Sequence, residues 1–433
     1  MSIRRSVRRR RPIAPSLVLA VVAAAFLAGV GSAQDPAAAG RSSDITLETV
    51  TALDGAVGGV AVDALGWIYV ADFGERVWKI DPFGKVEVLA DSLYGTSGNA
   101  LDSAGVLYQS SFYGDQIHRI HRDGSVELFA SGLEGPVGVV VLDDGTVFAT
   151  NCRGNWIARI TADGAVERFA ESELLSCPNG LARGPDGSLY IVNFNGGNVL
   201  RLTIDGENAG AIERFATIPQ PGLGHGAFVG TAFYVTGFRS NRVFRIDPDG
   251  TVQPVIGSGA FGEDDGVGLE VTMASPNGIA YDARRDALYV NDYRLPWPQR
   301  LAFAEPPHSA LRRIRLPSLN DVLVPRIEAG DVEGAVAAAR AFRADRPGRV
   351  NLLSLNAVGY RLLQAGDVEA AVALFQLNTE WFPGEANPWD SLGEALALAG
   401  RRDEAIRAYE TALERAPEMP TALQALERLR SGD

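Results

Sequence analysis

Polar residues that could hold or activate a ligand recur about forty residues apart, and each stands directly before a glycine. An imidazole can exchange a proton near neutral pH, and an amide side chain can orient a ligand through hydrogen bonds. His225 is therefore the candidate for a catalytic group, although the sequence does not identify a catalytic residue. Ligand binding is predicted for Ser97, Asn179, His225 and Asn277. Six aligned positions share the following glycine: Val57, Ser97, Val137, Asn179, His225 and Asn277.

A second set of residues ends the aromatic strands of the same repeats. Aspartate and asparagine at such points commonly cap the following turn by accepting backbone hydrogen bonds, and this interpretation is favoured. The alternative is that Asp72, Asn193 and Asp292 contribute to a ligand site. Six aligned positions form the set: Asp72, Ser111, Asn151, Asn193, Gly237 and Asp292.

Four of these residues could together bind a divalent metal, either calcium or zinc. The candidates are Asn179, His225, Asn277 and Asp292. Calcium prefers several oxygen ligands, carboxylates above all, so the set supports no firm metal assignment. A site of three histidines is not supported either, because two of the four histidines in the chain lie on or beside a predicted outer strand.

The spacing of these residues follows from a repeat of about forty residues. Each copy contains a short motif, expected in its third strand, that ends in a basic residue followed by an aliphatic residue. Successive copies of this motif begin 40, 40, 42, 44 and 68 residues apart. Asp-Gly turns between apolar runs predict hairpins, so each copy contains four short antiparallel strands. Six such copies predict an all-β, six-bladed propeller over residues 44–317. The segment 45–50 is expected to supply the outer strand of the sixth blade and close the ring.

The repeats resemble NHL repeats and the related senescence-marker/gluconolactonase propellers. The phrases Tyr69–Asp72 and Ser275–Ala280 carry this resemblance. Enzymes of the gluconolactonase-like class place a Glu, an Asn and a late Asp around one divalent metal. Only the middle position matches here, at Asn179, while Val57 and His225 stand at the two carboxylate positions. The resemblance therefore implies the fold more strongly than the lactonase reaction.

From residue 318 to 433 the chain changes to an Ala-, Leu-, Glu- and Arg-rich texture with helical period. Trp389, Gly393, Ala405 and Pro417 match the spacing of tetratricopeptide repeats, and a similar series stands 34 residues earlier. A small all-α domain of such repeats with a capping helix is therefore predicted. Its groove is expected to bind a protein partner or to pack internally.

The N-terminus has the pattern of an export signal. Residues 1–33 contain six arginines, then an apolar run from Leu17 to Val30 and small residues. Residues 34–43 are expected to form a linker. Cleavage would place the protein in the periplasm or outside the cell, and an uncleaved membrane anchor is the alternative. Loss of the six arginines changes the net charge from -13 to -19, which argues against binding to nucleic acid or anionic lipid.

The two cysteines and one tryptophan complete the set of candidates. Cys152 follows the second strand of the third repeat, and Cys177 precedes the first strand of the fourth. These connections emerge on one face of neighbouring blades, so a disulfide is predicted in an exported protein, with a free thiol pair or a metal site as the alternatives. Trp297, between two prolines, is expected to cover the funnel, as a ligand-stacking lid or as a rigid plug.

The leading hypothesis is an exported binding protein. A small molecule or a peptide would occupy the propeller funnel, and a protein partner would bind the helical repeats. The alternative is a gluconolactonase-like hydrolase with a rearranged metal site in the funnel. A third interpretation is an interaction platform with no funnel ligand, so the sequence alone leaves open whether the protein is an enzyme.

Overall fold

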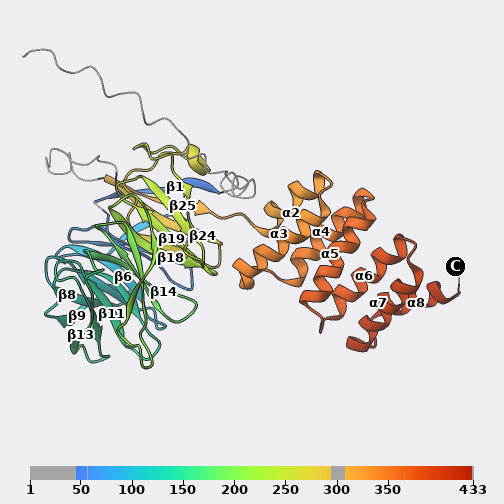
Figure 1. The fold of residues 1–433 in the computed structure, drawn as a ribbon, viewed down its shortest axis with the longest axis horizontal. Coiled ribbons are helices and arrows are strands. Elements are labelled where there is room, and N and C mark those ends of the chain that lie inside the picture. Colours follow the sequence, from blue (N-terminus) through green and yellow to red (C-terminus); the bar gives the residue numbers. More distant parts are fainter. Residues whose placement is uncertain (1–44, 56, 294–307, 432–433) are drawn as a thin grey trace, which may run out of the picture. The chain divides into compact units, whose positions relative to one another are not determined.

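The computed structural model describes residues 45–55, 57–293 and 308–431. Six antiparallel sheets are followed by seven α-helices (Figure 1). The predicted combination of a six-bladed propeller and a helical domain is therefore confirmed. Among the described residues, no helix is long and apolar enough to cross a membrane.

Blades one to five each contain four consecutive strands, with the first strand of each at the propeller axis. Blade one contains β2(Val60–Val62), β3(Ile68–Ala71), β4(Val77–Ile80) and β5(Val86–Ala90). Blade two contains β6(Thr96–Leu101), β7(Leu107–Ser111), β8(Gln116–Ile120) and β9(Val126–Ser131). Blade three contains β10(Pro136–Val141), β11(Val147–Asn151), β12(Trp156–Ile160) and β13(Val166–Glu171). Blade four contains β14(Pro178–Arg183), β15(Leu189–Asn193), β16(Asn198–Leu202) and β17(Ile212–Thr217). Blade five contains β18(Leu223–Val229), β19(Ala232–Gly237), β20(Arg242–Ile246) and β21(Val252–Ile256).

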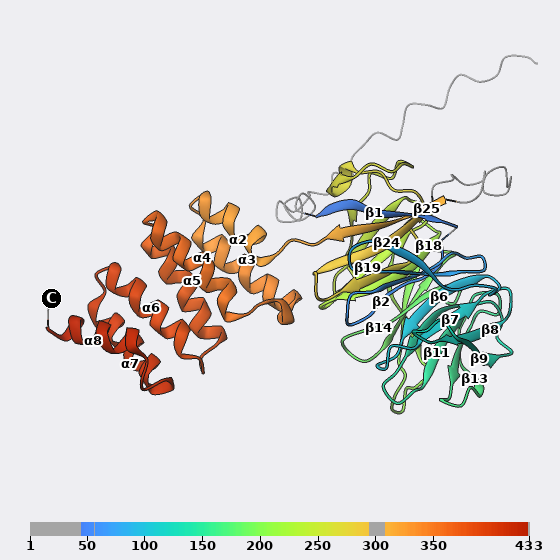
Figure 2. The ribbon, with the colours of Figure 1, turned by 180° about the vertical axis from the view of Figure 1, so that it is seen from behind.

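The sixth blade joins both ends of the propeller sequence, as predicted. Strand β1(Thr46–Asp54) pairs with β25(His308–Arg315), from Thr46 opposite Arg315 to Asp54 opposite His308. The two inner strands are β24(Ala287–Tyr293) and β23(Ile279–Asp282). A two-residue strand that the sequence did not predict, β22(Gly266–Val267), pairs with the outer side of β1. Figure 2 shows β1 and β25 side by side. The ring is thus closed by strands from opposite ends of the propeller.

Glycines let the six inner strands approach one another closely around the axis. A Cβ atom on Gly98 would lie 2.2 Å from the carbonyl oxygen of Val137 in the next blade. A Cβ on Gly138 would lie 2.5 Å from the oxygen of Asn179, and one on Gly278 would lie 2.5 Å from that of Gly58. No real side chain tolerates such distances, so glycine is a steric requirement at these positions.

Between the blades, apolar side chains of neighbouring sheets form separate small cores. One core combines Ile157 of blade three with Leu189, Ile191 and Leu200 of blade four, and all four are fully buried. Because successive side chains of a strand point to opposite faces of the sheet, these apolar residues face the neighbouring blades. The polar residues lie at the strand ends. The packing between sheets therefore holds the radial arrangement on which the funnel depends.

The C-terminal domain consists of helices that pack in antiparallel pairs. Gly359 and Gly393 lie against the rings of Phe375 and Tyr409, and a Cβ at either glycine would come within 2.9 Å of the ring atoms. Small residues thus permit close helix packing, as the repeat pattern predicted. The helices are α2(Leu319–Glu328), α3(Val332–Asp345), α4(Leu352–Ala365), α5(Val368–Trp381), α6(Ala386–Leu398), α7(Arg402–Arg415) and α8(Pro420–Ser431).

The axial glycines give the first prediction. Gly98→Ala is expected to lower the free energy of unfolding by about 3 kcal/mol, because the added methyl group overlaps the Val137 carbonyl. Gly384→Ala is the control, since a Cβ there meets no atom within 4 Å, and its effect is expected to stay within about 0.5 kcal/mol. Urea denaturation of both variants makes the comparison. Equal stability of the two would contradict the steric account.

Candidate functional site

A cavity of about 390 Å³ opens at the axis, on the face where the connections between β3 and β4 and their counterparts emerge. Its inner tier comes from the N-terminal ends of the first strands. The residues of that tier include Ser97, Val137, Asn179 and Asn277, together with Val57. The cavity therefore brings together three of the residues predicted to bind a ligand.

The outer tier is a collar of residues that lie at the end of each second strand or just beyond it. Five of the six positions are aromatic, and the sixth is half of a disulfide. These collar residues are Phe73, Phe112, Cys152, Phe194, Phe238 and Tyr293. Tyr113 and Cys177 complete the lining, and no charged side chain among the described residues lines the cavity. The walls are thus mainly apolar and aromatic.

The sequence-based alignment missed this collar by one residue. It selected the positions just before, from Asp72 to Asp292, because their polar side chains suggested chemistry. Successive side chains of an extended chain point to opposite sides. The polar residue at each of these positions therefore points toward the turn, and the residue after it points into the cavity. The available signal was the aromatic residue that follows five of these six positions.

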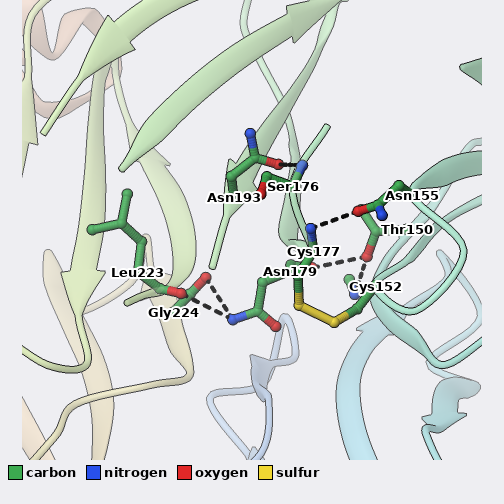
Figure 3. Close-up of a disulfide and its surroundings, with 10 residues drawn as sticks. Thr150, Cys152, Asn155, Ser176, Cys177, Asn179, Asn193, Leu223 and Gly224 are labelled. Atoms are coloured by element: carbon green, nitrogen blue, oxygen red, sulfur yellow. Dashed lines mark hydrogen bonds between the residues drawn. A yellow bond between two sulfur atoms is a disulfide. The ribbon is translucent and has the colours of Figure 1, made fainter. Parts of the chain in front are cut away.

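Two inner-tier asparagines are held by the backbone of the next blade. The Nδ2 of Asn179 donates to the carbonyl oxygens of Leu223 (3.1 Å) and Gly224 (3.2 Å), as Figure 3 shows. The Nδ2 of Asn277 donates to the oxygen of Val57 (3.0 Å). Because carbonyl oxygens can only accept, these contacts fix which end of each amide is nitrogen. The two Oδ1 atoms are therefore the acceptors that the amides offer to the cavity.

His225 occupies a different position from the one the sequence predicted. In blade six, Gly278 lies opposite Asn291, and in blade five the pairing of Gly226 with Val235 puts His225 opposite Thr236. His225 thus stands where blade six has its axial glycine, and Gly224 takes the place equivalent to Asn277. Blade one is also shifted by one residue, with Gly58 rather than Val57 at that place. Alignment on the following glycine failed in blade five because His225 itself takes the axial place and Gly226 follows it. It failed in blade one because two glycines, Gly58 and Gly59, stand in succession.

The His225 side chain fills the axis. Its Cε1 atom lies 3.1 Å from the Cβ position of Gly98 in blade two, directly across the ring. The residue is 8% exposed, it is not among the residues lining the cavity, and its Nε2 has no hydrogen-bond partner. Burial lowers its pKa to about 4, so the imidazole is neutral at pH 7.

Asp72 and Asn193 form hydrogen bonds with neighbouring loops. The Oδ1 of Asp72 accepts from the backbone N–H groups of Gly74 (2.6 Å) and Arg76 (3.0 Å) and from the Thr96 hydroxyl (2.9 Å). Asn193 accepts from the backbone of Ser176 and donates to that of Leu174. Their side-chain atoms cap turns, which is the interpretation the sequence favoured.

Asp292 lies in a buried ion pair. Its carboxylate accepts from Arg312 at 2.8 Å, and Arg312 also contacts Asp265 at 2.8 Å. Burial raises the pKa of Asp292 to about 6, although the guanidinium opposes the shift. Asp292 thus helps to anchor the segment around Asp265 against β25.

The residues present do not fit a divalent cation. No carboxylate lines the described cavity, and no three His, Cys, Asp or Glu side chains cluster within metal distance in the parts of the chain that are described. Of the four candidate ligands, His225 is turned into the axis and Asp292 is paired with Arg312. Trp297 lies outside the described residues.

The predicted disulfide is confirmed. Cys152 and Cys177 are bonded, with their Cα atoms 3.9 Å apart, and both line the cavity (Figure 3). Cys177 has a left-handed backbone (φ 49°), where the equivalent residues of blades two and three are Gly95 (φ 72°) and Gly135 (φ 65°). A side chain in this conformation costs about 1 kcal/mol, so blade four accepts local strain that places a sulfur atom in the wall.

Fold and site together define a six-bladed propeller with a plugged axis and an uncharged cavity on its funnel face. Within this class, the chain belongs to the virginiamycin B lyase family, whose model matches residues 51–289. A tetratricopeptide repeat model matches residues 386–419, over α6 and α7. No curated protein sequence matches the chain.

Solved structures with TM-scores above 0.5 support the fold. A gluconolactonase from Xanthomonas campestris is 22% identical and aligns over 65% of this chain and 93% of its own, with a TM-score of 0.51. An auxiliary nutrient binding protein from Bacteroides thetaiotaomicron is 15% identical over 62% of this chain and 76% of its own, with a TM-score of 0.52. Virginiamycin B lyase from Staphylococcus aureus is 18% identical over 63% and 100%, with a TM-score of 0.46. The predicted kinship with gluconolactonase-like propellers is thus confirmed at the level of fold.

The disulfide gives the second prediction. Replacing both cysteines removes a cross-link between residues 25 apart, so Cys152→Ala/Cys177→Ala is expected to lose about 3 kcal/mol of unfolding free energy. Cys152→Ala/Cys177→Gly is expected to be more stable than that variant by about 1 kcal/mol, because glycine adopts the left-handed backbone without strain. Chemical denaturation compares the two. A glycine variant no more stable than the alanine variant would refute the strain at Cys177.

His225 gives the third prediction, on pH. Its folded pKa of about 4 is below the ordinary value of 6.5, so the unfolded chain takes up a proton first as the pH falls. Stability from the neutral imidazole is fully present above pH 6.5 and is lost as the pH falls toward 4. Relative to His225→Gln, the wild type is expected to lose about 3 kcal/mol between pH 7 and pH 4, by denaturation at each pH. Parallel pH profiles would contradict a buried neutral His225.

Proposed function

We propose that this protein is an exported binding protein whose propeller takes an uncharged small molecule into the funnel and whose helical repeats bind a protein partner. The observation that carries the proposal is the cavity lining, which combines aromatic rings with amide oxygens and has no charged side chain among the described residues. A volume of about 390 Å³ is within the range of small-molecule sites.

The polar groups of the cavity favour a ligand with a hydrogen-bond donor. The amide nitrogens of Asn179 and Asn277 are engaged with backbone carbonyls, which leaves their oxygens for a ligand N–H or O–H. An anion would face these acceptors and the negative faces of the collar rings without a cationic partner, and its desolvation would cost several kcal/mol. Neutral ligands are therefore preferred.

The alternative is a hydrolase or lyase, as family membership and the likeness to a gluconolactonase suggest. Such a reaction needs a group in contact with the substrate that can move a proton or polarise a carbonyl. The cavity lining offers neutral amides, a hydroxyl at Ser97 and phenols at Tyr113 and Tyr293, while His225 lies in the axis below. These groups fit orientation of a ligand better than catalysis.

Export and a protein partner complete the proposal. The basic and apolar N-terminus supports export, and the disulfide suits an oxidising compartment. The helical repeats support a protein contact, since such repeats commonly present a binding groove. Exported material lacking residues 1–33 would agree with this assignment, and full-length protein retained in the membrane would contradict it.

The fourth prediction tests the funnel. At pH 7, 1-naphthylamine is uncharged and carries N–H donors, whereas 1-naphthoate has a similar ring and a negative charge. Fluorescence titration is expected to show binding of the amine and at least tenfold weaker binding of the carboxylate. Phe194→Ala, in the collar, is expected to weaken the amine about tenfold.

Phe83→Ala is the matched control, because Phe83 is 96% exposed in the turn between β4 and β5, at the end of the blade away from the funnel. This variant should bind the amine as the wild type does. Preference for the carboxylate, or turnover of gluconolactone that depends on added calcium, would instead support the enzyme.

A further inference from the structure

A group of four aromatic residues, two of them exposed and two half-buried, extends the cavity over blades one and two. We call this group the aromatic shelf, and it consists of Phe73, Tyr94, Phe112 and Tyr113. Ring centroids lie 5.4 Å apart for Tyr94 and Tyr113, 5.2 Å for Phe112 and Tyr113, and 5.7 Å for Phe73 and Phe112. These separations are those of aromatic pairs in direct contact.

The shelf is continuous with the funnel. Phe73, Phe112 and Tyr113 line the cavity, whereas Tyr94 lies beyond it and contacts Tyr113. Tyr94 is 64% exposed and Tyr113 is 50% exposed, so the aromatic surface runs from the cavity into solvent. A ligand that fills the cavity can thus reach the shelf without crossing polar surface between Tyr113 and Tyr94.

The four rings are not required by the cores of the propeller. None of them belongs to the buried clusters of blades one and two among the described residues. Phe73 also has a left-handed backbone (φ 53°), which is unfavourable for a bulky residue. Strain and exposed aromatic area without a packing role are typical of ligand-binding surfaces.

The shelf is also rigid and electrically neutral. The Tyr113 ring packs against Gly95, where a Cβ would come within 2.5 Å of its Cδ2 atom, so the ring is held in place. The guanidinium of Arg153 lies 5.4 Å from the Phe112 centroid and is paired with Asp115. A preformed surface loses little entropy on binding, and its neutrality matches that of the cavity.

We propose that the ligand consists of two linked flat ring systems without net charge, one held in the funnel and the other stacked on Tyr94 and Tyr113. This inference rests on the proposed function, because it assumes that the funnel binds a neutral molecule. It adds a second subsite and a ligand class, namely an elongated diaryl compound with a donor near the inner-tier amide oxygens. Stacking on the shelf contributes affinity that a single ring system cannot obtain.

The test compares two probes that differ by one ring. N-phenyl-1-naphthylamine adds a phenyl group to 1-naphthylamine and keeps an N–H donor and zero charge. Fluorescence titration of the wild type is expected to give tighter binding of the two-ring probe. Tyr94→Ala is expected to weaken the two-ring probe about three- to tenfold and to leave the one-ring probe within twofold. Tyr94→Phe should keep the wild-type affinity for both probes, and so should Phe83→Ala.

The outcomes separate the shelf from the funnel. If Phe194→Ala weakens both probes but Tyr94→Ala changes neither, the funnel stands and the shelf is refuted. If the wild type binds the two-ring probe no more tightly than the one-ring probe, the shelf is again refuted. If neither probe binds, or if Phe194→Ala has no effect on either, the funnel proposal itself fails.

Discussion

The close approach of six inner strands around one axis is the constraint on which the rest of the structure depends. Backbone of one blade lies where a Cβ of the preceding blade would otherwise stand, as at Gly98 against Val137 and at Gly138 against Asn179. The ring is therefore as narrow as polypeptide allows, and its diameter is not adjustable. This fixes the floor of the cavity and leaves only the residues above it free to vary in chemistry. One axial position carries a side chain, His225, which fills the space that the glycines leave.

A belt of side-chain hydrogen bonds ties the inner strands together. The hydroxyls of Ser110, Thr150 and Thr236 donate to the carbonyls of Val137 (2.9 Å), Asn179 (2.9 Å) and Asn277 (2.6 Å) in the next blade. The amide of Asn291 serves in the same way, toward Gly58 at 3.1 Å. Polar groups near the axis thus satisfy the backbone of neighbouring blades, which is costly to leave unpaired when buried. Recognition therefore falls to the free amide oxygens of Asn179 and Asn277 and to the aromatic residues of the collar and the shelf.

Much of this could be predicted from the sequence, because its signals are local and repeated. The Asp-Gly turns and the basic motif fixed the number of blades, and the strand character of residues 45–50 indicated how the ring closes. The pairing of Cys152 with Cys177 could be predicted because the strand order of the blades places both residues on the same face of neighbouring blades. His225 was misplaced because it stands where the other blades have the axial glycine, and the glycine after it, Gly226, was taken for the axial one; an error of one residue reverses which way a side chain points.

Other features depend on contacts that no local pattern encodes. The partner of Asp292 is Arg312, twenty residues further along the chain and on the next strand, so its buried ion pair was invisible to motif analysis. Tyr94 lies in a connection between blades, where neither strand nor helix period applies. The collar is predictable in principle, since an aromatic residue follows five of the six aligned positions at the ends of the second strands.

The most direct test of the account is a crystal structure of the protein with 1-naphthylamine. The account predicts the naphthalene ring inside the collar, in contact with Phe194, and the amino nitrogen within hydrogen-bond distance of the Oδ1 of Asn179 or Asn277. A hydrated cation held by those amide oxygens, or an amine bound only outside the funnel, would contradict it.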